Sequence, residues 1–403
     1  MLQALGIDVH TYHMNEGHSA LLALELLART ERPDLELRPG DSRYDIGDVR
    51  EQCIFTTHTP VEAGHDQFNY DLVERILGEV IEPPLVRSLA GADRLNMTRL
   101  ALNLSGYVNG VAKRHAEVSA HMFPGYRVHA ITNGVHPRMW TCPSFASLYD
   151  KYVPSWQHEP EQLVRADQIP DDEIWSAHQA AKQRLIQCIE KRCGTALSLD
   201  QPIIGFARRM TSYKRPDLLL SDSARLRAIA AQQPLQIILA GKAHPRDEPG
   251  KALIHFIHQR MRELSDAIRT VYLPNYGLDA AALLVSGVDI WLNTPLRPRE
   301  ASGTSGMKAA FNGVLNLSVL DGWWLEGYIE GVTGWAIGAS SAFDANDGDG
   351  HALFDTLAKA VLPLYYGDRA AWIQMMKGAI SKNAYYFNSH RMMRRYATEA
   401  YLR

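Results

Sequence analysis

Apolar residues follow two spacings along the chain, one typical of strands and one typical of helices. After an extended segment, DVHTYHMN, the apolar residues of GHSALLALELLART recur every three to four positions and predict a helix. Charged loops are expected up to Arg50. The segments EQCIFTTHT and YRVHAIT predict two more strands, and we expect helical stretches between the turn at Pro60 and about Ala120.

A second series of strands and helices begins at Pro202, after a mostly helical region over 141–200. Its expected strands are the apolar runs PIIGFA, LQIILAG, RTVYLPN, DIWLN and GVLNLSVL. Helices are expected between them, including PDLLLSDSARLRAIA, and SHRMMRRYATEAYLR predicts a terminal helix. Strands that alternate with helices imply parallel sheets joined by right-handed crossovers. The two series therefore predict an α/β protein with two doubly wound domains that face each other across a cleft.

Composition narrows the class of protein. The chain has 403 residues, 46% of them hydrophobic and 22% charged, which is typical of a soluble globular protein with two or three domains. A net charge of −3 provides no basic field for nucleic acid or an anionic membrane. Four cysteines without a CxxC pair favour reduced thiols in the cytoplasm and indicate no metal site. We see neither a signal peptide nor a membrane span.

The strongest candidate chemistry lies in RPREASGTSGMK, residues 297–308, between an expected strand and a helix. Small residues bring backbone N–H groups close together, and the free N–H groups at the start of a helix bind phosphate. Thr304 and Lys308 are four residues apart, so a helix would place them on one face. One turn could hold a phosphate beside an amine, but a glycine-rich turn before an exposed lysine explains the pattern equally well.

Charged and polar residues follow other predicted strands as well. The segment RRMTSYKR, residues 208–215, has four cations in eight residues after a buried strand, which would attract an anion. Lys242 follows the next strand in GKAH. The groups NEGH, THT and TNGVH follow the strands of the first series. Histidine and asparagine at several strand ends favour a polar, sugar-like ligand.

These segments resemble the α-glucan phosphorylases that act on glycogen, starch and maltodextrin. EASGTSGMKAAFNGVLNLSVLDG resembles the pyridoxal-phosphate lysine segment of that family, and FARRMTSYKRPDLL resembles its phosphate-binding segment. Further blocks are similar in the family's order, namely NEGHSA, THTPVEAGHDQF, VNGVAKRHAEV, TNGVHPRMW, AGKAHP and LPNYGLDAA. The resemblance covers nearly the whole chain and looks nearest to the shorter bacterial and archaeal branch.

The resemblance implies a GT-B type fold and a reaction. Residues 1–132 would be the latter part of the N-terminal domain and residues 133–403 the C-terminal domain. The terminal helix, about 380–403, would pack back on the first domain. The reaction would be the reversible phosphorolysis of terminal α-1,4-glucosyl units of a glucan or maltodextrin by inorganic phosphate, which gives glucose 1-phosphate with retention. Nucleic acid and membranes are not expected partners, and a homo-oligomer is compatible with the family.

The resemblance also implies roles for individual residues. Pyridoxal 5′-phosphate would be attached to Lys308 as a Schiff base, and its 5′-phosphate would exchange a proton with the substrate phosphate. The catalytic set would be Lys308, Arg209 and Lys214. The residues expected to bind the cofactor are Lys308, Thr304, Ser305, Arg208, Lys214 and Tyr276. The residues expected to bind substrate are His58, Asn133, Tyr213, Glu300, Ser302 and Gly303.

Elementary electrostatics agrees with these roles. Two phosphates held close together repel each other unless cations screen them. Arg208, Arg209 and Lys214 would supply that screening. Close phosphates also raise each other's pKa, which permits general acid catalysis near neutral pH without a carboxylate.

The sequence departs from the family's pattern in two places. We find no counterpart of the glycine-rich loop and helix of the family's N-terminal domain, so we expect an incomplete N-terminal domain and weak phosphorolysis by this chain. Gly277 stands where larger enzymes carry a cation.

Two alternative functions stay open at this point. One is a nucleotide-sugar glycosyltransferase similar to glycogen synthase, which needs no cofactor lysine, and the other is an inactive glucan-binding remnant.

Overall fold

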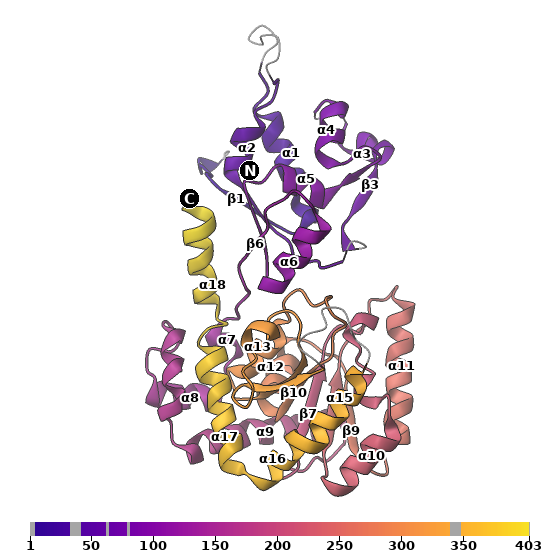
Figure 1. The fold of residues 1–403 in the computed structure, drawn as a ribbon, viewed down its shortest axis with the longest axis vertical. Coiled ribbons are helices and arrows are strands. Elements are labelled where there is room, and N and C mark those ends of the chain that lie inside the picture. Colours follow the sequence, from indigo (N-terminus) through magenta and orange to yellow (C-terminus); the bar gives the residue numbers. More distant parts are fainter. Residues whose placement is uncertain (1–4, 33–41, 62–63, 79–80, 339–347, 403) are drawn as a thin grey trace. The chain divides into compact units, whose positions relative to one another are not determined.

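Buried apolar side chains form two separate clusters, and the chain divides into two units around them. Unit 1 comprises Met1–Thr132 and Arg394–Arg403, and unit 2 comprises Asn133–Met393. The computed structural model describes residues 5–32, 42–61, 64–78, 81–338 and 348–402. Each unit contains a parallel sheet together with helices, so the predicted mixed α/β class with parallel sheets is confirmed (Figure 1).

Unit 1 is built on a four-stranded parallel sheet with the order β1–β2–β5–β6. Its strands are β1 (Tyr12–Asn15), β2 (Cys53–Thr56), β5 (Tyr107–Gly110) and β6 (His129–Ala130). A separate antiparallel pair consists of β3 (Gln67–Asn69) and β4 (Arg94–Asn96). The helices of this unit before β6 are η2 (Gly17–Ser19), α1 (Leu21–Ala28), α2 (Ile46–Gln52), α3 (Tyr70–Leu77), α4 (Pro83–Ala90), α5 (Met97–Asn103) and α6 (Lys113–Met122).

Two predictions for unit 1 are wrong in part. Residues 46–50 were expected in a loop, but they begin helix α2, because the Asp45 carboxylate accepts a hydrogen bond from the backbone N–H of Asp48 and caps the helix. The helical stretches expected between Pro60 and about Ala120 are present as α3, α4, α5 and α6, but the strands β3, β4 and β5 lie between them and were not predicted. Strand β5 reads YVNG, in which asparagine and glycine give little strand signal, yet all four residues are buried between β2 and β6.

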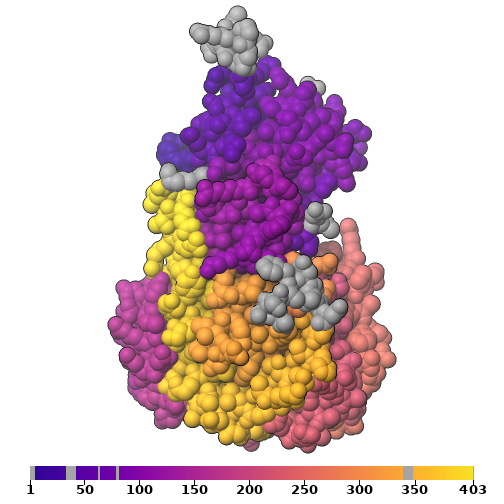
Figure 2. All heavy atoms as spheres, in the orientation of Figure 1, coloured from indigo at the N-terminus to yellow at the C-terminus, as the bar shows by residue number. Residues whose placement is uncertain are grey.

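The end of the chain belongs to unit 1. The chain ends in the helical segments α18 (Ser389–Tyr396) and η10 (Ala397–Tyr401), and unit 1 includes them from Arg394 onward. The Tyr396 hydroxyl accepts a hydrogen bond from Asn109 Nδ2 at 3.0 Å, and the Tyr401 hydroxyl lies 2.8 Å from His13 Nδ1. In Figure 2 the yellow terminal residues lie against the indigo and purple residues of this unit. The segment grouped with unit 1 begins at Arg394, whereas the expected terminal helix begins near residue 380.

Unit 2 contains a six-stranded parallel sheet with the order β12–β11–β10–β7–β8–β9 (Figure 1). Its strands are β7 (Ile203–Ala207), β8 (Gln236–Ala240), β9 (Arg269–Leu273), β10 (Ile290–Asn293), β11 (Leu315–Val319) and β12 (Gly334–Ile337). The chain adds strands on one side of β7 and then returns to add strands on the other side. This is doubly wound topology, and its order reverses between β7 and β10.

Helices of unit 2 connect these strands. Before and between strands β7–β12 lie α7 (Pro137–Trp140), α8 (Pro143–Tyr152), η5 (Pro160–Gln168), α9 (Asp171–Cys193), η6 (Ser212–Lys214), η7 (Leu218–Leu220), α10 (Ser223–Gln232), α11 (Glu248–Glu263), α12 (Leu278–Gly287), α13 (Thr304–Ala310) and α14 (Trp324–Gly327). After β12 follow α15 (Asp349–Thr356), η8 (Leu357–Val361), α16 (Leu362–Gly367), α17 (Arg369–Gly378) and η9 (Ala379–Ala384). Within the described ranges, no helix is both long and apolar enough to cross a bilayer.

One predicted helix of unit 2 is interrupted. The segment expected to be helical over 216–230 forms η7 and, separately, α10. The break occurs because the Asp222 carboxylate accepts a hydrogen bond from the backbone N–H of Arg225 at 2.9 Å, and this starts a new helix.

A buried ion cluster joins the beginnings of β7 and β10. Asp289 precedes β10 and is fully buried, and its carboxylate lies 2.8 Å from Lys182 Nζ and 2.9 Å from His178 Nε2. The same carboxylate accepts a hydrogen bond from the backbone N–H of Ile203, the first residue of β7, at 2.7 Å. This contact holds the two strands whose far ends carry the polar site described below.

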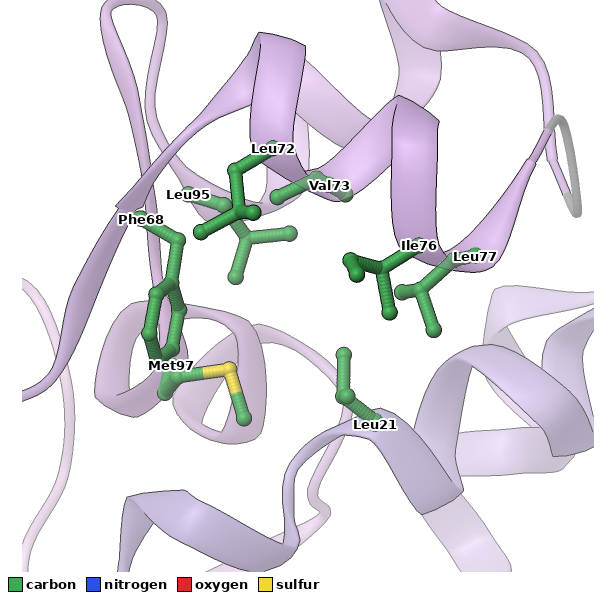
Figure 3. Close-up of a pocket in the computed structure, with 8 residues that line it drawn as sticks. All are labelled: Leu21, Phe68, Leu72, Val73, Ile76, Leu77, Leu95 and Met97. Atoms are coloured by element: carbon green, nitrogen blue, oxygen red, sulfur yellow. The ribbon is translucent and has the colours of Figure 1, made fainter.

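Unit 1 also has an apolar groove beside α3 (Figure 3). Ile76 on this helix is 69% exposed, and none of the α3 residues is buried. The groove is lined by Leu21, Phe68, Leu72, Val73, Ile76, Leu77, Leu95 and Met97. Because these side chains are all apolar, the groove offers no groups that could recognise a sugar hydroxyl or a phosphate.

Candidate functional site

Polar side chains of unit 2 gather where β7, β10 and β11 end. Strands β7 and β10 are neighbours at the point where the strand order reverses, and the loops after such strands diverge and leave room for a ligand. Residues 208–215 follow β7, residues 294–303 follow β10, and Asp321 follows β11 shortly after its end. The candidate chemistry predicted from the sequence therefore lies on adjacent strand ends.

Glu300 binds two cations from the loop after β7. Its Oε2 atom lies 2.5 Å from Lys214 Nζ and 2.6 Å from an Arg208 guanidinium nitrogen. The three side chains are at most 10% exposed. The backbone N–H of Glu300 donates a hydrogen bond to Asp321 at 2.9 Å, which fixes the loop at this residue. One carboxylate and two cations leave this trio with a charge of about +1 when all three are ionised, which favours an anionic ligand, while the nearby Asp321 acts in the opposite direction.

Burial and the neighbouring charges shift the pKa of both Lys214 and Glu300. Burial, aided by the Arg208 charge, lowers the pKa of Lys214 to about 8, although Glu300 acts in the opposite direction. Burial alone would raise the pKa of Glu300, but Arg208 and Lys214 outweigh it, and the pKa is lowered. Lys214 and Glu300 are therefore both charged at neutral pH, and Lys214 loses its proton in mildly alkaline solution.

Backbone contacts hold the two loops together. The backbone N–H of Leu296 donates to the carbonyl oxygen of Tyr213 at 2.7 Å, and the Thr294 hydroxyl donates to that of Lys214 at 3.0 Å. Lys214 Nζ also lies 4.6 Å from the centre of the Tyr213 ring. These contacts join residues about 80 positions apart and place the lysine against Glu300.

Lys308 lies on helix α13, which begins after Gly303. Gly303 has a φ of 85°, a conformation that favours glycine, and it precedes the first helical residue. The Lys308 amine lies 3.8 Å from the centre of the Trp140 ring, and burial lowers its pKa. Among the described residues, no hydrogen-bond or ion-pair partner of this amine is found. The Ser305 hydroxyl oxygen accepts a hydrogen bond from Trp291 Nε1 at 3.1 Å.

The other predicted residues of unit 2 lie at different depths. Burial raises the pKa of Tyr213 and of Tyr276, and the charge of Arg208 acts on both, so both rings lie near the trio. Arg209 is exposed, and its side chain makes no hydrogen bond or ion pair with the described part of the chain. Asn133 is half-buried, and its carbonyl oxygen accepts a hydrogen bond from Arg391 at 2.9 Å.

His58 belongs to unit 1. Its Nε2 atom lies 2.6 Å from Asn15 Oδ1, and its backbone N–H donates to the Glu16 carboxylate at 2.9 Å. Burial lowers the pKa of His58, so the ring is neutral at pH 7. Glu16 has a φ of 73°, which is unusual for a residue other than glycine, and its carboxylate also accepts a hydrogen bond from the Thr59 hydroxyl at 2.7 Å.

A small pocket adjoins the trio. It is lined by Arg208, Asn293, Pro295, Glu300, Gly303, Ser318, Asp321 and Trp323. Three buried polar atoms in this region have no hydrogen-bond partner among the described residues: Arg208 Nη1, Asn293 Oδ1 and Ser302 Oγ. Buried polar atoms normally have partners, so these three are available to a polar ligand or to water.

Our sequence analysis did not single out Asn293, Asp321 or Trp140. Asn293 ends a predicted strand, and Asp321 follows another in VLDG. The rule that identified the other candidates, a polar residue at a strand end, could have found both. No local signal identifies Trp140, because it contacts Lys308 across 168 residues of sequence.

Comparison with known proteins identifies related sequences. The family model described as carbohydrate phosphorylase matches residues 65–330. The chain is 39% identical to a maltodextrin phosphorylase of Thermococcus litoralis, over 100% of this chain and 52% of that protein. It is 37% identical to a glycogen phosphorylase of Aquifex aeolicus, over 100% of this chain and 64% of that protein. It is 35% identical to a glycogen phosphorylase of Mycobacterium bovis, over 97% of this chain and 51% of that protein. The chain thus spans about half to two thirds of the length of these relatives.

Proposed function

Because the chain belongs to the carbohydrate phosphorylase family, we propose that it functions as an α-1,4-glucan phosphorylase. The reaction is the reversible phosphorolysis of terminal α-1,4-glucosyl units by inorganic phosphate, which gives glucose 1-phosphate with retention. The substrate is a glucan or a maltodextrin. This proposal agrees with the printed names of the relatives and with the polar, cationic character of the unit 2 site.

The observation that carries the proposal is the trio of Arg208, Lys214 and Glu300. A phosphate dianion needs cations that are held in place and shielded from water, because a charge-assisted hydrogen bond is worth more there than at the surface. Lys214 and Arg208 are buried and positively charged, and one Arg208 nitrogen has no partner among the described residues. We assign substrate phosphate to these two cations and to Arg209, whose exposed side chain supplies a third charge.

The glucosyl unit is assigned to polar groups next to the phosphate. We propose that Glu300 and Ser302 contact sugar hydroxyls, together with Gly303 and Tyr213. The Ser302 hydroxyl is buried without a partner among the described residues, which is the condition expected of a group that a ligand completes. His58 and Asn133 are further proposed glucosyl contacts, on the ground of the family resemblance.

The residues present fit pyridoxal 5′-phosphate. An amine must be neutral to bond to an aldehyde, and the half-buried Lys308 amine has a lowered pKa. We propose that Lys308 holds the cofactor covalently and that its phosphate is held by Thr304, Ser305, Arg208, Lys214 and Tyr276. When bound, the cofactor supplies a 5′-phosphate that can donate and accept a proton.

The chain's own side chains then have defined tasks in the reaction. Arg208 and Lys214 screen the negative charges that phosphorolysis brings together, and this lowers the repulsion between them. The same cations keep the substrate phosphate next to the anomeric carbon, where its negative charge stabilises positive charge that develops on the sugar. Glu300 positions both cations by accepting hydrogen bonds from them. A neutral His58 can donate a hydrogen bond to a sugar hydroxyl or accept one from it.

We also propose that the fold is of the GT-B type. Unit 2, with its doubly wound strand order, would supply the C-terminal domain that binds cofactor and phosphate. Residues 1–132 would be the latter part of the N-terminal domain, and residues 133–403 would form the C-terminal domain with a terminal helix that returns to unit 1.

The experiment measures phosphate-dependent release of glucose 1-phosphate. The chain is loaded with pyridoxal 5′-phosphate and given maltodextrin with radiolabelled phosphate, because the label detects even slow turnover. We expect the wild-type chain to release labelled α-glucose 1-phosphate and the Lys308→Arg variant to release none. The matched control is Lys242→Arg, at an exposed lysine of the loop after β8, and it should release the product as the wild type does. Turnover of a nucleotide sugar without the cofactor, or glucan binding without any label transfer, would contradict the proposal.

A further inference from the structure

We propose that Asp349 is a positioning residue for the anion site of unit 2. Its carboxylate holds together the two loops that carry Lys214 and Glu300, although it does not itself face the ligand. This inference rests on the proposed phosphate site. It assigns a role to a residue of α15, an element to which neither the sequence motifs nor the family resemblance gives a function.

One buried carboxylate joins both loops. Asp349 is 1% exposed, and its Oδ2 atom lies 2.5 Å from an Arg215 guanidinium nitrogen. Its other oxygen, Oδ1, lies 2.7 Å from a guanidinium nitrogen of Arg297. Arg215 belongs to the loop after β7 and directly follows Lys214, whereas Arg297 belongs to the loop after β10 and lies three residues before Glu300. The carboxylate therefore crosslinks the two chain segments that meet in the trio.

Arg215 extends this crosslink along the backbone. Its guanidinium donates hydrogen bonds to the carbonyl oxygens of Thr294 at 2.8 Å and of Pro295 at 2.9 Å. Its φ is 45°, a conformation that residues other than glycine adopt at a cost, so these contacts must compensate for strain in the chain. The conformation directs this cation to Asp349, while its neighbour Lys214 is bound to Glu300.

Loss of the Asp349 charge has a definite consequence. The largely buried guanidinium groups of Arg215 and Arg297 would lose the carboxylate that faces both of them. The two positive charges would then repel each other strongly, because little water screens them. The loops would relieve this repulsion by moving apart. Lys214 would then leave Glu300, and the cations would no longer converge on a bound phosphate. A charge-assisted hydrogen bond from one of these cations to phosphate is worth about 1.5–3 kcal/mol, so its loss would lower the phosphate affinity about 10- to 150-fold.

The variant Asp349→Asn tests this because it removes the charge and keeps the shape. The matched control is Asp355→Asn in the same helix, whose carboxylate pairs with Arg225 and is 31% exposed. We measure the affinity for inorganic phosphate by calorimetry, the affinity for maltodextrin, and hydrogen exchange at the backbone amide of Leu296. We expect Asp349→Asn to weaken phosphate binding about tenfold or more and to speed exchange at Leu296, with maltodextrin binding unchanged. Asp355→Asn should match the wild type in all three.

A second variant tests the same inference if Asp349→Asn does not fold. Arg215→Lys keeps a positive charge but cannot make all of the guanidinium contacts, so it should show the same selective loss. Unchanged phosphate affinity and unchanged Leu296 exchange in either folded variant would overturn the inference. An equal loss of phosphate and maltodextrin binding would also overturn it, because general damage to unit 2 predicts that result. If the wild type binds no phosphate, the proposed function fails, and exchange at Leu296 still decides whether Asp349 positions the loops.

Discussion

Replacing Lys214 with methionine tests the role of the buried trio in phosphate binding. Methionine fills much the same space and removes only the amine and its charge. Glu300 keeps its contact with Arg208 at 2.6 Å, so the carboxylate is not left alone in the interior. Unit 2 should therefore still fold, and the loss should be confined to the ligand.

The size of the effect follows from two observations. On the proposed function, Lys214 gives phosphate one charge-assisted hydrogen bond in a site where side chains are at most 10% exposed, and its loss should cost about 1.5–3 kcal/mol, or about 10- to 150-fold in phosphate affinity. Because the pKa of Lys214 is lowered to about 8, wild-type affinity should also fall about twentyfold between about pH 7.5 and about pH 9.5. Lys214→Met has no such group, so this part of the pH dependence should disappear.

The assay is calorimetric titration with inorganic phosphate across this pH range. The matched control is Lys242→Met, which removes an exposed cation from the neighbouring loop after β8 and should leave affinity and pH profile unchanged. If Lys214→Met binds phosphate as tightly as the wild type, Lys214 does not bind the ligand. If the variant keeps the alkaline loss of affinity, a group other than Lys214 is responsible for it.

Three further predictions concern single residues. Arg209→Ala should weaken phosphate binding about tenfold in calorimetry and leave glucan binding nearly intact, and the opposite pattern would make Arg209 structural. Gly306→Ala should lower the free energy of unfolding by about 1–3 kcal/mol, because the added carbon would lie 2.4 Å from Asn316 Oδ1. In the control Gly367→Ala the added carbon meets no atom within 4 Å, so thermal unfolding should be unchanged. Burial lowers the pKa of His115 from 6.5 to about 4, so the unfolded chain binds more protons between these values. The free energy of unfolding of unit 1 should fall by about 3 kcal/mol as the pH drops through this window, and His115→Asn should abolish that loss in acid titrations.

The sequence predicted the strands that are continuous apolar runs and missed several strands in which polar residues or glycine interrupt the run. Strands β7, β8, β10 and β11 are fully buried, and a central strand of a parallel sheet reads as a continuous apolar run, which is a strong local signal. Strand β5 is equally buried, but its sequence YVNG ends in a polar residue and a glycine, and strand β12 begins with Gly334. Their pairing with neighbouring strands overrides their weak local preference.

The cluster of polar residues at the ends of β7 and β10 could be predicted from the sequence, but the partners of its cations could not. Four cations in residues 208–215 predicted an anion site after β7. In the structure, Arg208 and Lys214 bind Glu300, Arg209 is exposed, and Arg215 binds Asp349. The partner of Arg215 is 134 residues away, so no local pattern separates this cation from its neighbours. Only the fold decides which charges face a ligand.

Borohydride reduction shows whether the unit 2 site holds the cofactor of a phosphorylase, as we propose. The chain is incubated with pyridoxal 5′-phosphate, reduced, digested and mapped by mass spectrometry. We predict a pyridoxyl group on Lys308, because its amine is half-buried, has a lowered pKa and lies in the last turn of α13, the short helix that begins just after Gly303. The label should be absent in Lys308→Arg. A label on Lys214 or Lys242 instead of Lys308, or no label at all, would contradict the account.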